Sequence, residues 1–451
     1  MRIAALILFA LAGLCSANAK PNIVVIMADD LGWRDLHCYG NASVDTPTLD
    51  QLAADGMRFT DAYAASPVCT PTRAAMMTGQ SPARLRITNH APGNPDGFAL
   101  EGSSLHEAPN IRHLPLAAVT IAERLSAAGY ATAHVGKWHL SHVVRGDKRL
   151  AETDLRPEKQ GFDLNAGGNS SGGPASYFAP YRNSAFKDGQ DGEYLPDRLA
   201  DEAIRFIRQH KEQSFYLNWW PYSVHYPMQA REALIAKYRQ RTEIKDPIYA
   251  AMIEGLDTAI GSFLKALDEA GLRENTLVLF KSDNGGYHGD NRPLRGFKGM
   301  LYEGGIRIPW IVRWPGQVPP GTLNSTPVIS TDCYPTLLEV AGLPPTEAHP
   351  VDGKSLLPLL TQTSGFQRET LYFHYPNYAF HKRNRLGSAL REGRYKLIQN
   401  YDDHSLELYD LGSDIGEKNN LAAQAPDLTR RLAEKLQAWL VKSEAQLPAR
   451  H

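Results

Sequence analysis

Cysteine is scarce in this sequence, and its scarcity excludes a small scaffold held together by disulfide bonds. Only four of the 451 residues are cysteine, namely Cys15, Cys38, Cys69 and Cys333. Exported domains that lack a large core are, by contrast, dense in cysteine. Cys15 lies in an N-terminal segment that we expect to be removed, and Cys38 and Cys333 could either pair or stay free.

Net charge is also nearly absent. The chain carries 48 Lys and Arg against 49 Asp and Glu, which gives a formal net charge of −1 at pH 7. Such a balance produces no field over the whole protein that would attract nucleic acid or an anionic membrane, so neither is expected as a partner. An anionic substrate must therefore be held by a local cluster of cations.

A long apolar run is missing as well. Residues 3–14 form an apolar stretch behind Arg2, but a membrane-spanning helix needs about 20 such residues. Small residues follow at positions 17–19, where a signal peptidase would cut. We expect residues 1–19 to be a signal peptide, so that the mature chain begins at Lys20 and is periplasmic or secreted without a membrane anchor. An uncleaved anchor is the alternative.

What the sequence does contain is an alternation of short apolar runs with segments of helical period. Strands are expected at residues 22–28, 130–135, 215–219, 276–281 and 309–313, and helices at 46–54, 117–128, 197–209, 247–270 and 334–341. The run at 22–28, NIVVIMA, lacks polar alternation, which is typical of a strand buried on both faces of a parallel sheet. The pattern predicts an α/β fold with a large, mostly parallel or mixed central sheet flanked by helices. Residues 166–192, rich in Gly, Ser, Pro and Asn, are expected to form a surface loop.

The sequence pattern changes near residue 366. Strand-like pieces at 370–375, 386–391, 396–400 and 406–409 precede an amphipathic helix at 427–441. They predict a small C-terminal antiparallel sheet with a packed helix. We therefore divide the chain into a signal peptide (1–19), a catalytic α/β domain (20–365) and a C-terminal subdomain (366–451), because one core stops growing at roughly 250–300 residues.

The first chemically suggestive string is Cys69-Thr70-Pro71-Thr72-Arg73. Proline is tolerated in the first turn of a helix, so the string predicts that Cys69 lies at a helix N-terminus. Unpaired N–H groups and the positive end of the helix dipole favour an anion there. Taken alone, Cys69 could equally be a small core residue beside a helix start.

This string resembles the sulfatase signature Cys-x-Pro-Ser/Thr-Arg, in which the cysteine is oxidised to formylglycine (3-oxoalanine). Residues 129–140 (GYATAHVGKWHL) resemble a second sulfatase signature, and LRGFKG with GGIRIP, between residues 294 and 309, resembles a third segment. With the opening strand and SDNGG at 282–286, the likeness runs from about residue 21 to the C-terminus. Thr72 is a departure, because serine is more usual there.

The resemblance implies an alkaline phosphatase-like fold and an arylsulfatase-like hydrolase of sulfate monoesters. It also implies a maturation partner, either a formylglycine-generating enzyme or an anaerobic sulfatase-maturating enzyme. A phosphoester or phosphonate monoester hydrolase of the same superfamily is the alternative, which turnover of aryl sulfate against aryl phosphate would separate. An inactive glycan-binding relative is less consistent with the sequence, because no site position has been lost.

Oxygen ligands follow two of the expected strands. Asp29 and Asp30 end the run at 22–28, and Asp283 and Asn284 end the run at 276–281. Open α/β sheets bind ligands at the carboxyl ends of their strands, and oxygen ligands suit Ca²⁺ or Mg²⁺ better than zinc or copper. Alone, such residues could be helix caps. The family resemblance implies that these four residues, together with residue 69, bind one Ca²⁺.

Five further side chains complete the expected site. Arg73, Lys137 and Lys298 are cations that could hold a sulfate, whose oxygens need donors. His139 and His225 are candidates for proton transfer, because imidazole can take and give protons near neutrality. The resemblance implies that Arg73 steadies the formylglycine, that both lysines hold sulfate oxygens, that His225 protonates the leaving alcohol, and that His139 deprotonates the hydrated formylglycine to expel sulfate.

The sequence indicates less about the substrate. Aromatic residues beside His225 suit a sulfated sugar that stacks on flat rings, although they could equally be core; they are Trp219, Trp220, Tyr222 and Tyr226. In the C-terminal part, His374 or His381 could contact the sugar, or His374 could be a structural bridge. Which sugar, which hydroxyl and whether cleavage is exo or endo cannot be read from the sequence.

Overall fold

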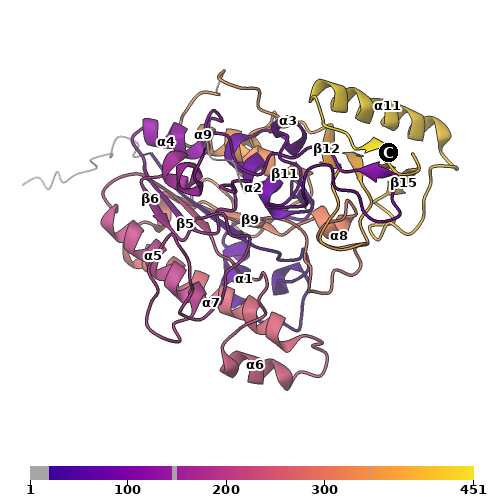
Figure 1. Cartoon of the computed structure of the whole chain (residues 1–451). Helices are drawn as coiled ribbons and strands as arrows, with labels where there is room; N and C mark the ends of the chain where they lie inside the picture. The colour runs from indigo at the N-terminus through magenta and orange to yellow at the C-terminus, as the bar shows by residue number, and fades with distance from the viewer. Residues whose placement is uncertain (1–19, 145–149, 346, 451) are drawn as a thin grey trace, which may run out of the picture.

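The computed structural model describes residues 20–144, 150–345 and 347–450 (Figure 1). The expected signal peptide and Cys15 lie outside these residues, so the export prediction is not tested by the structure. Within the described ranges, no helix has both the length and the apolar composition needed to cross a membrane.

The body is built on an eight-stranded sheet whose central strands are deeply buried. Its order is β10 (Thr322–Asn324), β2 (Met57–Phe59), β9 (Trp310–Arg313), β8 (Thr276–Ser282), β1 (Asn22–Ala28), β7 (Phe215–Trp220), β5 (Ala131–Gly136) and β6 (Leu164–Ala166). Neighbouring strands are parallel except around β9, which runs antiparallel to β2 and β8. The expected mixed central sheet is therefore confirmed.

Helices cover both faces of this sheet, and β1 shows why. Val24 and Ile26 belong to one core, whereas Ile23, Val25 and Met27 belong to the other. The first core contains α1 (Pro47–Ala54), α5 (Leu195–Gln209) and α7 (Pro247–Glu269), and the second contains α2 (Cys69–Thr78), α4 (Ile121–Ala127) and α9 (Cys333–Val340). The two groups lie on opposite sides of the sheet in Figure 1. Because successive strand residues point to opposite faces, a strand between two cores must be apolar throughout.

The C-terminal part forms a second sheet, as predicted. It is antiparallel, in the order β12 (Thr370–Tyr375), β13 (Gly387–Glu392), β14 (Tyr395–Asn400) and β15 (Leu406–Asp410). Helix α11 (Pro426–Lys442) packs Leu432, Leu436 and Leu440, four residues apart, on one face of the sheet. The other face shares a core with the body, where Phe373 and Ile398 join Val68 of the loop before α2. The domain boundary at residue 366 therefore stays a prediction.

Several short elements were not expected from the sequence. They include the strands β2, β6 and β10 of the central sheet, the helices α3 (Pro82–Leu85), α6 (Glu232–Arg239), α8 (Glu303–Ile306) and α10 (Leu357–Leu360), and the strand pairs β3 (Ala62–Tyr63) with β11 (Val328–Ile329) and β4 (Leu105–His106) with β16 (Ala449–Arg450). The expected helix at 117–128 begins later because Thr120 caps it. Thr120 Oγ1 accepts from Glu123 N at 3.1 Å, and Glu123 Oε2 accepts from Thr120 N at 2.8 Å. Cys38 and Cys333 are both free.

Buried ion pairs fasten the C-terminal sheet to the body. We call this cluster the junction; it comprises Asp61, Glu303, Arg307, Arg391, Lys396 and Glu417. Lys396 Nζ lies 2.9 Å from Glu303 Oε1 and 2.8 Å from Glu417 Oε1, with all three side chains fully buried. Arg391 of β13 reaches Asp61 of the body at 2.6 Å. The junction therefore links strands β13 and β14 to α8 and to the turn before β3.

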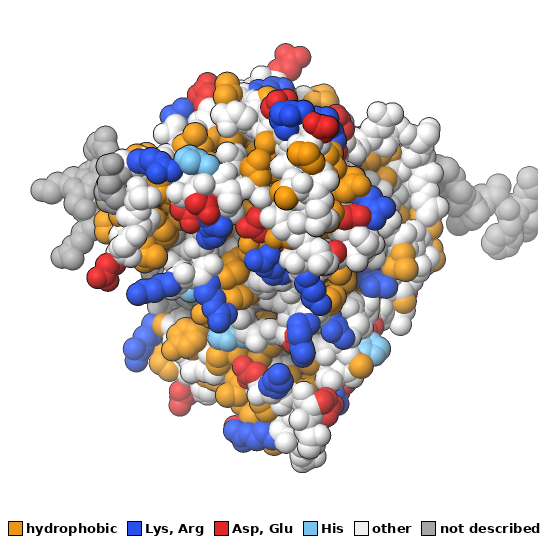
Figure 2. Space-filling view, turned by 90° about the vertical axis from the view of Figure 1, so that its right-hand side faces the viewer, with side chains coloured by type: hydrophobic (Ala, Val, Ile, Leu, Met, Phe, Trp, Pro, Cys, Tyr) orange, Lys and Arg blue, Asp and Glu red, His pale blue; other side chains and the backbone are white. Residues whose placement is uncertain are grey.

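The outer surface on the C-terminal side is polar. Figure 2, which turns the right-hand side of Figure 1 toward the viewer, shows Lys and Arg side chains across the middle of that face, with fewer acidic side chains between them. The near-zero net charge of the chain therefore conceals an uneven distribution of charge.

Candidate active site

The four expected oxygen ligands meet at one edge of the central sheet. Strands β1 and β8 are parallel with Ala28 opposite Ser282, so the residues that follow them lie side by side. Asp30 N donates to Asp283 Oδ1 at 3.1 Å, and Asn284 Nδ2 donates to Asp30 Oδ1 at 2.7 Å. Asp30 has a φ of 63°, a left-handed conformation that is uncommon outside glycine and is found at functional sites.

Three cations surround these carboxylates. Arg73 Nη2 lies 2.7 Å from Asp283 Oδ2, and Lys137 Nζ lies 2.7 Å from Asp29 Oδ2. Lys298 Nζ lies 2.6 Å from Asp30 Oδ1. All six side chains are buried. We call this group of three carboxylates and three cations the active centre.

Positive charge is distributed unevenly within the active centre. Burial raises the pKa of Asp29 to about 8 although Lys137 opposes it. Burial acts in the same sense on Asp30, but Lys298 and His225 outweigh it and lower the pKa of that carboxyl. Asp29 is thus the carboxylate with the least compensation by the protein's own cations.

The oxygen ligands fit a divalent cation. Asp29 Oδ1 and Asn284 Oδ1 are buried and accept no hydrogen bond from any described residue. Unsatisfied buried acceptors cost about 1–3 kcal/mol each, a cost that a bound cation removes. Ligand atoms of Asp29, Cys69 and Asp283 all lie within 4.8 Å of one another. This group could hold a metal ion, and its oxygen-rich composition suits a hard one.

Cys69 is the first residue of α2, as the sequence predicted. Val68 before it is extended (φ −141°, ψ 161°), and all ten residues of the helix are buried. Arg73 follows one turn later on the same helix, which fixes its distance from residue 69. Thr72 Oγ1 bonds both N and O of Ser66 at 3.1 Å, so this hydroxyl anchors the loop that leads into the helix. Burial raises the pKa of the Cys69 thiol to about 12, which leaves it protonated at neutral pH.

Both expected histidines line the same cavity as Cys69. His139, with a φ of 60°, places Nε2 against Ala91 O and has its buried Nδ1 without a hydrogen bond in the described structure. His225 Nε2 lies 3.8 Å from Asp30 Oδ2, and its Nδ1 lies 2.8 Å from Tyr226 O. Burial, followed by Lys298, lowers the pKa of His225 to about 3, and burial followed by Lys137 lowers that of His139. Both rings are therefore neutral at pH 7 and can accept a proton.

A cavity of about 430 Å³, which we call the central pocket, opens in front of these groups. Its lining residues are Asp30, Cys69, His90, Ala91, Pro92, His139, Gly172, Gly173, His225, Tyr226, Tyr287, His288, Lys298 and Phe380. Five of the ten sequence-predicted site residues thus line the pocket. Of the other five, Asp29, Arg73, Lys137 and Asp283 are bonded to one another, and the amide of Asn284 donates to Asp30. The structure brings all ten together.

Comparison with known proteins identifies the family. A sulfatase family model matches residues 21–343, well over half of the chain. The chain belongs to the sulfatase family. A second model, described as N-sulphoglucosamine sulphohydrolase, C-terminal, matches residues 296–446. The protein is therefore a sulfuric ester hydrolase.

Individual sulfatases are similar over almost the whole chain. A sulfatase of Formosa agariphila is 33% identical over 510 residues, which cover 95% of this chain and 90% of the relative. Arylsulfatase A of Homo sapiens is 33% identical over 491 residues, which cover 97% and 90%. The solved structure of Ps i-CgsB is 29% identical with a TM-score of 0.77, and the match covers 93% of both chains.

Two glycines of this sulfatase shape the pocket and were missed by sequence reasoning. A Cβ on Gly172 would lie 2.9 Å from His139 Nε2, and a Cβ on Gly173 would lie 2.7 Å from His225 Nδ1. Only residues without side chains let this loop approach both rings. The signal was present as a Gly-Gly pair inside the segment expected to be a mere surface loop.

The structure also decides the role of the aromatic residues that precede and follow His225 in the sequence. Trp219, Trp220 and Tyr222 are at most 1% exposed, so of the two interpretations that the sequence left open, the core holds for these three and stacking on a sugar does not. Trp219 and Trp220 enter opposite cores because β7 is buried on both faces, and Tyr222, just after the strand, joins the core of Trp219. Only Tyr226 of that cluster reaches the central pocket.

The two C-terminal histidines have structural contacts. His374 is 1% exposed, and its ring nitrogens lie 2.7 Å from Ser388 Oγ and 2.9 Å from Gln446 O. The alternative of a structural bridge therefore holds for His374, and a sugar contact does not. His381 Nε2 lies 2.8 Å from Lys298 O, so His381 supports the loop that presents Lys298.

Proposed function

We propose that this sulfatase removes sulfate from a sulfated carbohydrate, using a formylglycine formed from Cys69 and one Ca²⁺ held by Asp29, Asp30, residue 69, Asp283 and Asn284. The observation that carries the carbohydrate assignment is the rim of the central pocket. Among the described residues with large exposed apolar side chains, three are aromatic, namely Tyr226 (66%), Tyr287 (40%) and Phe380 (47%). All three line this pocket.

Exposed aromatic rings are costly unless they meet a partner, and a sugar presents the apolar ring face that such side chains bind. Relatives support the same class of substrate. N-acetylgalactosamine-6-sulfatase of Rattus norvegicus is 34% identical over 396 residues. Ps i-CgsB was solved in complex with k-i-k-neocarrahexaose. We therefore propose a sulfated glycan as the substrate class.

The cations of the active centre and the two histidines have different roles according to their positions. Lys298 and His225 stand on the pocket side of Asp30, where they can hold sulfate oxygens, and His225 can pass a proton to the leaving alcohol. A bound sulfate ester would raise the pKa of His225 through its negative charge. Arg73 and Lys137 lie deeper and orient Asp283 and Asp29. His139 lines the central pocket together with residue 69, and its unbonded Nδ1 can take a proton from that residue.

Ca²⁺, when bound by these residues, would polarise oxygens at the sulfur, and a hydrated formylglycine at residue 69 would offer a hydroxyl as the nucleophile. A maturation partner, either a formylglycine-generating or an anaerobic sulfatase-maturating enzyme, is part of the proposal. So is export through the signal peptide at residues 1–19.

The test begins with mass analysis of the peptide that contains residue 69, in protein produced together with a maturating enzyme. Conversion of Cys69 to formylglycine is expected, and full activity with an unmodified thiol would refute the mechanism. The same protein is then offered 4-nitrophenyl sulfate, 4-nitrophenyl phosphate and a panel of sulfated monosaccharides. Faster turnover of the phosphate would favour a phosphoester hydrolase instead.

A further inference from the structure

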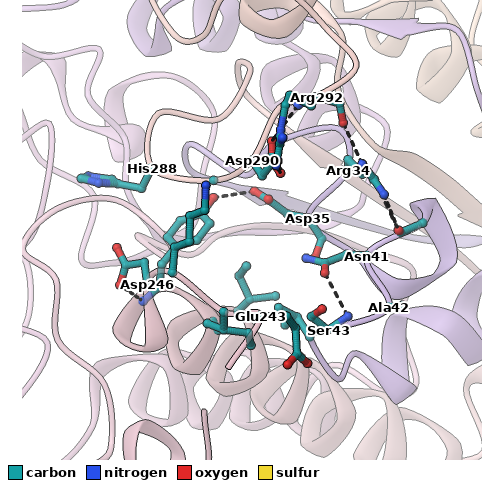
Figure 3. Close-up of a pocket in the computed structure, with 18 residues that line it drawn as sticks. Arg34, Asp35, Asn41, Ala42, Ser43, Glu243, Asp246, His288, Asp290 and Arg292 are labelled. Atoms are coloured by element: carbon teal, nitrogen blue, oxygen red, sulfur yellow. Dashed lines mark hydrogen bonds and ion pairs between the residues drawn. The ribbon is translucent and has the colours of Figure 1, made fainter. Parts of the chain in front are cut away.

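A second cavity lies beside the central pocket, and nothing in the proposed chemistry uses it. It measures about 460 Å³, and we call it the side pocket. The loop 40–44, the segment 243–253 and the loop 288–292 form most of its walls. Figure 3 shows Glu243, Ser43 and Ala42 along one side of the hollow, Asp290 and Arg292 on the other, and His288 at its edge.

The two cavities share one wall. His288 lines both the central pocket and the side pocket. The Tyr249 hydroxyl at the side pocket also reaches the active centre, because it bonds Asp35 Oδ2 at 2.5 Å and lies 3.4 Å from the backbone oxygen of Asp30. A ligand longer than one sugar could therefore pass from one cavity to the other across His288.

Aromatic rings form a continuous row along this path. The ring centroids of Phe380 and Tyr287 are 5.1 Å apart, those of Tyr287 and His288 are 4.9 Å apart, and those of His288 and Tyr249 are 6.0 Å apart. Phe380 and Tyr287 belong to the rim of the central pocket, whereas Tyr249 belongs to the wall of the side pocket. Tyr287 (40% exposed) and Phe380 (47%) offer apolar surface to a sugar, whereas Tyr249 (5%) is a largely buried part of the side-pocket wall.

The lining of the side pocket differs in chemistry from that of the central pocket. Val44, Ile244, Ala250 and Ile253 contribute apolar surface. The charged groups are of both signs, with Arg34, Lys245 and Arg292 facing Asp35, Glu243, Asp246 and Asp290. Arg34 donates only to backbone oxygens, and Asp290 is paired with Arg292. A site of mixed charge does not select a second sulfate, but it does suit the many hydroxyls of an uncharged sugar unit.

We infer that the side pocket binds the sugar next to the sulfated one, so that the preferred substrate is an oligosaccharide or polysaccharide rather than a sulfated monosaccharide. This inference rests on the proposed function. The sulfated sugar occupies the central pocket, the chain crosses His288, and the neighbouring sugar lies between the loop 40–44 and the loop 288–292.

The test compares chain lengths. Formylglycine-bearing protein is assayed on 4-nitrophenyl sulfate, on a sulfated monosaccharide identified by the panel, and on oligosaccharides of two and four units carrying the same sulfated sugar. We expect kcat/KM to rise by about tenfold or more from the monosaccharide to the tetrasaccharide, because binding of the neighbouring unit contributes to the transition state. Equal values for all chain lengths would overturn the inference.

A filling variant shows whether the gain comes from the side pocket. Ala42 is exposed, lines only the side pocket of the two, and donates no side-chain hydrogen bond, so Ala42→Trp fills the cavity without breaking a contact. The ratio of kcat/KM for tetrasaccharide to that for monosaccharide should fall about fivefold or more. Ala127→Trp, at an exposed position of α4, is the matched control and should leave the ratio unchanged. Equal loss on every substrate would contradict the assignment.

A second variant tests the same inference in case Ala42→Trp does not fold. Glu243 and Lys245 are exposed rim residues whose side chains form no hydrogen bond or ion pair with the described residues, so the double variant Glu243→Ala/Lys245→Ala should fold and should lower the same ratio. Binding can also be measured without turnover in Cys69→Ser protein by calorimetry with the tetrasaccharide. An affinity that Ala42→Trp does not weaken would overturn the inference. Failure of the wild type to cleave any sulfate ester would instead overturn the proposed function, and this inference with it.

Discussion

The active centre and the junction are two buried clusters of the same composition with different purposes. Each contains three carboxylates and three cations. In the junction, every carboxylate lies within 2.9 Å of a cation, although the contact between Glu417 Oε1 and Lys396 is an ion pair in distance without the alignment of a hydrogen bond. In the active centre every carboxylate also has a cation within 2.7 Å, but one oxygen, Asp29 Oδ1, is 3.5 Å from the nearest cation and accepts no hydrogen bond from a described residue.

The difference teaches that buried charge alone does not mark a functional site. Ion pairs that satisfy one another hold two parts of a chain in register, and replacing them by apolar groups is often tolerated. A cluster that has unsatisfied acceptors and lies at a pocket can bind a metal ion or a ligand. The following changes test this division between binding and stability.

The largest effect is expected in the active centre. Asp30→Ala removes a carboxylate from the proposed metal site and the partner of Lys298, so kcat/KM should fall by more than about 100-fold, the loss seen even for residues behind a metal ligand. Thermal unfolding should change far less than activity. Activity on 4-nitrophenyl sulfate and the melting temperature are measured together; wild-type turnover by the variant, or by the wild type after thorough chelation, would contradict the metal assignment.

The junction should respond in the opposite way. Lys396→Met leaves Glu303 and Glu417 buried without their shared cation, which typically costs about 3–5 kcal/mol of unfolding free energy. Activity per folded molecule should be retained. Urea unfolding measures the loss, and Lys418→Met, at a neighbouring exposed lysine, is the control. A loss of kcat without a loss of stability would show that the junction takes part in catalysis.

A smaller, pH-dependent effect is expected at His374 in the C-terminal sheet. Burial lowers the pKa of His374 from 6.5 to about 4, with the bond to Gln446 opposing the shift. Below pH 6.5 the unfolded chain binds a proton that the folded ring refuses, so stability present above pH 6.5 is lost as the pH falls toward 4, by up to about 3 kcal/mol. His374→Gln should reduce this slope in unfolding experiments at pH 7, 6 and 5. An unchanged slope would mean that other histidines carry the effect.

The smallest change concerns the rim of the central pocket. Tyr226→Ala removes an exposed ring that supports no core, so stability should be unchanged. Loss of stacking should lower kcat/KM for a sulfated sugar by about tenfold. The small substrate 4-nitrophenyl sulfate should be affected less. Equal losses on both substrates would remove Tyr226 from the sugar site.

The predictability of the site from the sequence follows from its construction. Asp29, Asp30, Asp283 and Asn284 follow apolar runs directly, and parallel pairing of β1 with β8 places them together. Such information is local and survives without a structure. The rim is different, because Tyr287 and Phe380 approach one another only through the packing of the C-terminal part.

The fold shows the same limit. The central strands were predictable because burial on both faces makes them apolar throughout, but that same uniformity hid the fact that Trp219 and Trp220 face opposite cores. Short strands such as β3 and β16 depend on partners far away in the chain, which no local pattern reveals. The junction could not be predicted for the same reason, since Asp61 and Arg391 are distant in sequence.

The burial of α2 determines when residue 69 can be modified. Residue 69 is 1% exposed, meets solvent only in the central pocket and begins a helix of which every residue is buried, so a modifying enzyme could not bind the segment around it in the folded protein. The formylglycine that we propose there must therefore form while the chain is still unfolded. Folding and modification then compete for each newly made molecule, and a faster-folding variant would yield a stable protein that is permanently inactive.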